Sequence, residues 1–142
     1  MAWLNYAFLT IFFYSLFDVF LKLSSDKMNT WLNAFFLNLV ATFVLFVFVV
    51  IAYFNGEKIF AVKPGGWFFS LLAGLAISGA GIFFLKMFAT GTNLSVGVPL
   101  VRVGMVVLGS LLGIFLLKEG YSFKYILGVL FSLVGLFLVI AK

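Results

Sequence analysis

The stretch that decides the fold is residues 31–54, WLNAFFLNLVATFVLFVFVVIAYF, which contains no charged side chain. A helix rises about 1.5 Å per residue, so a stretch of this length reaches across the hydrocarbon core of a bilayer, which is about 30 Å thick. Residues 43–50 are almost entirely Phe, Val and Leu, side chains that are more stable in lipid than in water. The stretch therefore predicts a transmembrane helix.

Four further apolar runs have the length of a membrane span, at about residues 2–22, 67–89, 96–117 and 123–141. The loops between the runs are short, and the longest, 55–66, leaves no room for a second domain. Short connections make consecutive helices antiparallel neighbours. We therefore expect an all-α membrane protein, a single domain over residues 1–142 that forms a bundle of five transmembrane helices.

Local signals mark the expected ends of these helices. Thr30 and Ser122 are candidate N-caps for the second and fifth helices. Pro99 falls in the first turn of the fourth helix, where its missing N–H costs little. Residues 23–29 read as a polar turn. The first run lacks a basic leader and a small-residue cleavage site, so we expect it to remain as a helix.

The composition excludes several classes of function. The chain is 65% hydrophobic and 9% charged, whereas soluble domains are roughly 45–50% apolar and about 25% charged. It contains no His and no Cys and only 4 Asp and Glu residues, so we expect no metal site, no cofactor and no enzymatic activity. The net charge of +5 comes mostly from lysines at the ends of apolar runs, which indicates contact with lipid headgroups rather than with nucleic acid.

The distribution of the basic residues does not predict which way the chain is oriented in the membrane. Five spans place the termini on opposite sides, which we call the near side, where the N-terminus lies, and the far side. The near side carries Lys58, Lys63, Lys118 and Lys124, and the far side carries Lys22, Lys27, Lys86 and Lys142, with Arg102 as a fifth if it reaches that way. Orientation follows the imbalance of Lys and Arg between loops. A near-even balance is expected of a chain that inserts both ways, although small counts also balance by chance.

Small residues indicate where the helices pack closely. In lipid, helices associate through close contact of small side chains and through polar contacts. The fourth and fifth helices carry such residues at Gly104, Gly109, Gly113, Gly128 and Gly135, which include a GxxxG pair. These glycines predict either packing within the chain or an interface with another protein.

Four charged residues fall inside the expected spans, and helix alternation places all four in the far half of the bilayer: Asp18, Lys22, Lys86 and Arg102. Tyr14 and Lys22 each lie four residues from Asp18, so the three side chains share one stripe of the first helix. In one interpretation Asp18 neutralises Lys22 or Arg102 while the lysines extend to the interface. In the other, Asp18 and Arg102 line a cavity that binds a polar substrate or relays a proton.

Other polar residues add to the candidate site. Three basic groups against one acid favour an anionic group such as a phosphate or carboxylate. Asn38 in the second helix lies four residues before Thr42 and is a candidate for hydrogen bonding across the bundle. Asn33 reads as interfacial and Glu119 as a solvated loop charge. Tyr14, Asp18, Lys22, Asn38, Lys86 and Arg102 form the predicted substrate-binding set.

The second half of the chain contains a series of sequence motifs that resembles the series in a known protein family. The stretch 83–89, FFLKMFA, is followed by a turn, by SVGVPL at 95–100, by a glycine-bearing helix that ends in Lys118-Glu119, and by a last helix with Gly128 and Gly135. Over about 60 residues this pattern resembles the EamA-like domain of the drug/metabolite transporter superfamily. Asp18 and Arg102 depart from it, because the family usually has uncharged residues at these positions.

The resemblance implies a carrier of a small metabolite or drug-like solute. Chains of this superfamily usually hold two such domains in inverted orientation, whereas this chain has room for one. The resemblance therefore implies alternating access by an antiparallel homodimer or by a pair with a paralogue, in a cell membrane such as the prokaryotic inner membrane. The alternatives are a flippase, or flippase subunit, for a lipid-linked anionic headgroup and a non-transporting accessory subunit.

Overall fold

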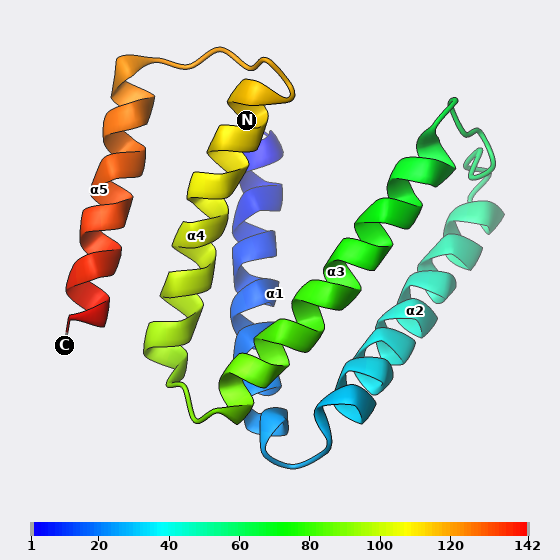
Figure 1. The fold of residues 1–142 in the computed structure, drawn as a ribbon. Helices are drawn as coiled ribbons and strands as arrows, with labels where there is room; N and C mark the ends of the chain where they lie inside the picture. The colour runs from blue at the N-terminus through cyan, green and yellow to red at the C-terminus, as the bar shows by residue number, and fades with distance from the viewer. Residues whose placement is uncertain (1, 142) are drawn as a thin grey trace. The chain divides into compact units, whose positions relative to one another are not determined.

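The computed structural model describes residues 2–141, and these form five α-helices joined by turns and short loops (Figure 1). The helices are α1 (Ala2–Ser25), α2 (Thr30–Phe54), α3 (Gly66–Ala89), α4 (Leu94–Phe115) and α5 (Phe123–Ile140). Each of them is long and apolar enough to cross a membrane. The predicted all-α fold with five transmembrane helices is therefore confirmed.

The helices fall into two compact units. Unit 1 is Met1–Thr90 and holds α1, α2 and α3, and unit 2 is Gly91–Lys142 and holds α4 and α5. The expectation of a single domain over residues 1–142 stays a prediction.

In unit 1, α3 packs against both of the other helices (Figure 1). The buried side chains gather where α1 ends, α2 begins and α3 ends, a region that we call the far end of unit 1. They are Asp18, Leu21, Ser25, Asn33, Ala34, Leu85 and Phe88. Among residues 3–90 no other residue is buried. Unit 1 is therefore tightly packed at one end only.

In unit 2, α4 and α5 form an antiparallel hairpin (Figure 1). The Ser110 hydroxyl donates to the carbonyl of Val106 at 2.6 Å. This bond uses the only hydroxyl proton of Ser110. The hydroxyl of Tyr125 on α5 therefore donates to Ser110 Oγ, at 2.5 Å. No residue of α5 is buried. This hydrogen bond joins the two helices of the hairpin, and most of α5 is left to be covered by lipid or by protein.

Serine hydroxyls extend α1 beyond its predicted end at residue 22. The Ser24 hydroxyl donates to the carbonyl of Leu21 at 3.0 Å, and the Ser25 hydroxyl donates to that of Lys22 at 2.8 Å. These side-chain hydrogen bonds lie in the added turn, which ends at Ser25. The prediction that residues 23–29 form a turn was therefore wrong for 23–25.

The N-caps agree with the prediction at one helix and differ at another. Ser122 caps α5, because its hydroxyl accepts from the backbone N–H of Tyr125 at 3.2 Å. At α2 the cap is Asn29, whose side-chain carbonyl accepts from the N–H of Trp31 at 2.9 Å. The predicted cap, Thr30, is instead the first residue of the helix.

Helix α4 begins and ends about two residues earlier than predicted. Because it starts at Leu94, Pro99 lies beyond the first turn and leaves the carbonyl of Ser95 without its helical N–H partner. At the other end Lys118 has a φ of 55°, and the N–H of Glu119 bonds the carbonyl of Gly113 at 3.1 Å. A left-handed residue of this kind ends a helix by directing the chain back over its last turn.

Candidate functional site

Asp18 is the buried acid of unit 1. It lies on α1 with only 4% of its surface exposed, beside the apolar residues of the far end. A charged group within a membrane span is costly, and such residues are functional candidates by default. Asp18 is therefore the central residue of the candidate site.

A polar row runs along α1 and includes Asp18. Its members are spaced four residues apart: Tyr6, Thr10, Tyr14, Asp18 and Lys22. Since each residue turns the helix by about 100°, each step of four shifts the row by about 40° around the axis. The sequence prediction identified the last three members and missed Tyr6 and Thr10, which the same spacing could have found.

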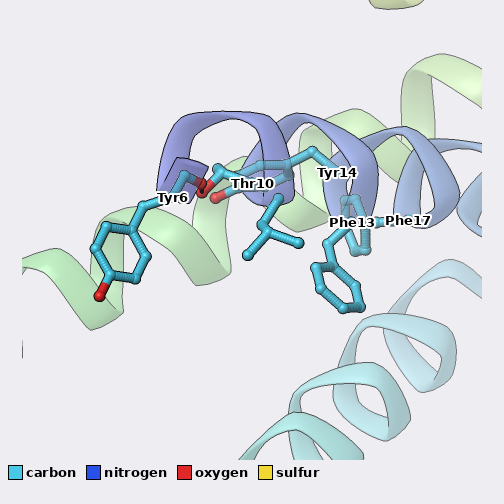
Figure 2. A pocket seen from close by; sticks show the side chains of 6 residues that line it. Tyr6, Thr10, Phe13, Tyr14 and Phe17 are labelled. Carbon is cyan, nitrogen blue, oxygen red and sulfur yellow. Dashed lines mark hydrogen bonds between the residues drawn. The ribbon is translucent and has the colours of Figure 1, made fainter. Parts of the chain in front are cut away.

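The first part of this row lines a groove on α1 (Figure 2). The groove has a volume of about 420 Å³ and is lined by Tyr6, Leu9, Thr10, Phe13, Tyr14 and Phe17. The Thr10 hydroxyl donates to the carbonyl of Tyr6 at 2.8 Å, so the two phenols are the principal polar groups. Aromatic rings with a few hydroxyls suit a solute that has an apolar body and a polar end.

Lys22 has partners on α3. Its Nζ donates to the carbonyl of Phe88 at 3.2 Å and lies 5.6 Å from the centre of the Phe88 ring. Phe88 is fully buried and next to the end of α3. The last carbonyls of a helix lack backbone donors and favour a nearby cation. Lys22 thus ties α1 to the end of α3.

Lys86 has its partner on α2. Its Nζ lies 4.7 Å from the centre of the Trp31 ring, a cation–π contact that ties α3 to the start of α2. We call Lys22, Trp31, Lys86 and Phe88 the far-end clamp. Two of the three basic groups that favoured an anionic substrate therefore contact aromatic rings of their own unit.

Asn33 belongs to the far end, although the sequence placed it at the interface. It is buried, and its Nδ2 donates to Ser24 Oγ at 3.0 Å, which links α2 to α1. Its position near the start of α2 gave no signal of this partner, because the contact depends on the extra helical turn of α1.

Asn38 lies on α2 and bonds within its own helix, since its Nδ2 donates to the carbonyl of Ala34 at 2.7 Å. It lines a second groove, of about 730 Å³, with Phe35, Leu39, Val40, Thr42, Phe43 and Phe46. The expected hydrogen bond from Asn38 across the bundle stays a prediction. Arg102 is half-buried on α4 of unit 2, and its pairing with Asp18 likewise stays a prediction.

The predicted packing glycines differ in their surroundings. A side chain at Gly104, Gly109, Gly128 or Gly135 would meet no atom within 4 Å, so the contact between α4 and α5 does not depend on these four. At Gly113 a Cβ would lie 2.6 Å from Oε2 of Glu119. The carboxylate of Glu119 therefore rests against the last turn of α4, while the residue itself lies in the loop after the helix and is exposed, as the sequence predicted.

The described residues 2–141 contain no group of three carboxylates that could hold a metal ion. The sequence model of the EamA-like transporter family matches residues 1–141. No curated protein and no solved structure matches the chain. A match over this length, on five helices that are each able to span a membrane, shows that the chain belongs to the EamA-like transporter family and is a multi-pass membrane protein.

Proposed function

We propose that the protein carries a small metabolite or drug-like solute across a membrane by alternating access, as an antiparallel homodimer or beside a paralogue. The observation that carries the proposal is the match of one EamA-like model to the whole of a chain with five spans. Transporters with inverted repeats place their site near the midplane, between two oppositely oriented halves. This domain supplies one half, and in the proposal a second chain supplies the other.

Two features support the antiparallel arrangement. The near and far sides carry similar numbers of basic residues, so the positive-inside rule gives no preferred orientation. Among the described residues, large parts of the helices also have no neighbour within their own unit, since α5 has no buried residue and four glycines have open space beside them. A second copy could occupy such faces through close helix contacts.

In this proposal Tyr14, Asp18 and Arg102 contact the polar end of the solute, and Asn38 contributes from the groove on α2. The aromatic groove on α1 receives the apolar part. Lys22 and Lys86 border the site. The partners of these two lysines weaken the alternative of a flippase for an anionic headgroup, because each is engaged by an aromatic ring.

We place the protein in a cell membrane, such as the prokaryotic inner membrane, with the bilayer and not nucleic acid as its surroundings. Its basic residues cluster at the ends of the spans, where lipid headgroups lie. Neither an enzymatic activity nor a cofactor is part of the proposal.

The test begins with a panel of radiolabelled amino acids, nucleosides and drug-like dyes and with the protein reconstituted in liposomes. The solute that accumulates most above empty liposomes is then measured with Asp18→Asn. We expect transport to fall by at least about tenfold, because a buried polar group that contacts substrate usually contributes more than about 1.4 kcal/mol.

The matched control is Asp26→Asn, which removes the same charge from an exposed position in the turn after α1. It should transport like the unmodified protein. Both variants should assemble normally in detergent. Wild-type transport by Asp18→Asn would remove this carboxylate from the mechanism, and a panel with no transported solute would favour the accessory subunit.

A further inference from the structure

We infer that the far-end clamp is a gate: Lys22 and Lys86 hold unit 1 closed at its far end, and these contacts break when the protein opens on that side. The inference rests on the proposed function, because a gate has a purpose only in a protein that exposes its site to each side in turn. It assigns to the two lysines a role other than holding the solute.

The far end contains a fully buried apolar cluster, which we call the plug, and Phe88 belongs to both the plug and the clamp. Leu21 of α1 and Leu85 and Phe88 of α3 are the largest fully buried side chains, with 0–2% of their surfaces exposed. The clamp lies over this plug, since Lys22 bonds the carbonyl of Phe88 and lies over its ring. Lys86 adds the start of α2 through Trp31. All three helices of unit 1 are thus joined at one level.

The rest of unit 1 is open. Among residues 3–17 and 35–84 no side chain is buried. Both grooves lie in this part, one on α1 and one on α2. Figure 1 shows α1 and α3 meeting at the far end and diverging from it. A wedge that is sealed at one end and open at the other is one of the two shapes that alternating access requires.

The clamp contacts are of a kind that can break and form again. They are one hydrogen bond to a backbone carbonyl and two cation–π contacts, and none of them pairs the lysine with a carboxylate. Trp31 and Lys86 are exposed, so water and headgroups can solvate the ammonium group when the contact is lost. Opening therefore leaves the Lys86 ammonium group solvated, and Lys22, which is half-buried in the last turn of α1, can extend its ammonium group to the interface.

The test uses single cysteines, because the chain has none of its own. Ala34→Cys reports on the far end, where Ala34 is buried, and Thr10→Cys reports on the α1 groove. Each variant is purified in nanodiscs, so that a charged, water-soluble thiol reagent reaches both faces. The rates of labelling are then compared with and without Lys22→Gln and Lys86→Gln together.

We expect Ala34→Cys to react slowly and Thr10→Cys quickly in the background with both lysines. Without them, labelling at residue 34 should rise by about tenfold and labelling at residue 10 should fall, because losing two modest contacts shifts the population of the two shapes by about this factor. Lys22→Arg keeps a cation and should keep residue 34 protected. Lys27→Gln and Lys58→Gln remove the same charge outside the clamp and should change neither rate.

Labelling rates that change in opposite directions at residues 34 and 10 distinguish a gate from contacts that only stabilise the packing of the helices. If both rates rise, the clamp merely holds the helices together and the inference is wrong. If neither rate changes, the lysines do not seal the far end and the inference is equally wrong. In either case the transport assay with Asp18→Asn still decides the proposed function, because that assay does not depend on the clamp.

Discussion

The side chain of Asn29 accepts a hydrogen bond from the N–H of Trp31 at 2.9 Å and so begins α2. Removing an N-cap costs about 0.5–2 kcal/mol. We expect Asn29→Ala to lower the free energy of unfolding by about 1 kcal/mol, measured by circular dichroism during titration from mild detergent into dodecyl sulfate. Thr30→Ala, at the next residue, should change it by less than about 0.5 kcal/mol. A larger cost for Thr30→Ala would contradict the assignment.

Glu119 and Gly113 illustrate a contact that spacing alone could not predict. The GxxxG pair of residues 109 and 113 suggested a shared packing face. The left-handed conformation of Lys118 turns the chain back, and this brings the Glu119 carboxylate against Gly113 while Gly109 stays open. The two glycines therefore have different neighbours, and backbone geometry at Lys118 decides which.

Leu21 on α1 belongs to the packed far end of unit 1, where only 2% of its surface is exposed. Truncating a buried Leu leaves a cavity and typically costs about 2–5 kcal/mol. We expect Leu21→Ala to destabilise the protein by an amount in this range, in the same unfolding titration. Leu23→Ala is the matched control, since Leu23 is 56% exposed on the same helix. Equal costs for the two variants would show that unit 1 is not packed as described.

Tyr125 joins α5 to α4 through the hydroxyl of Ser110. Hydrogen bonds between membrane helices contribute about 0.6 kcal/mol on average. We expect Tyr125→Phe to lower stability by about this amount and Tyr121→Phe, in the preceding loop, to have no measurable effect. The check is a double-mutant cycle with Ser110→Ala. A coupling energy of zero would mean that the two hydroxyls do not bond in the membrane.

The elements were largely predictable, because a membrane span has to be apolar along its whole length and few other segments are. Their ends were less predictable. The end of α1 depends on the hydroxyls of Ser24 and Ser25, and the start of α2 depends on whether Asn29 or Thr30 supplies the cap. At each of these helix ends, neighbouring polar side chains compete to form the terminal hydrogen bond. Hydropathy does not distinguish between such similar groups.

The candidate site was predictable only along one helix. The four-residue spacing of Tyr14, Asp18 and Lys22 places them in one row, and the structure keeps that row. The partners of Lys22 and Lys86 lie on other helices, at Phe88 and Trp31. Pairings between helices depend on how the spans cross, and the sequence of each span carries little information about that crossing.

At the scale of the whole molecule the balance of lysines should control activity. Lys58→Gln with Lys63→Gln depletes the near side, and Lys27→Gln with Lys142→Gln depletes the far side. Each pair should drive the chain into one orientation. We expect each altered chain to lose most of its transport when expressed alone and to regain it when both are expressed together. Full transport by either chain alone would contradict an antiparallel homodimer.

The most direct test of the antiparallel transporter is the orientation of the chain in intact cells. Met28→Cys in the α1–α2 turn and Phe60→Cys in the α2–α3 loop lie on opposite sides of the membrane and leave every lysine in place. A membrane-impermeant thiol reagent is applied before and after permeabilisation. We expect each site to be labelled from outside in part of the population and in the remainder only after permeabilisation. Labelling from outside at only one of the two sites would contradict this expectation.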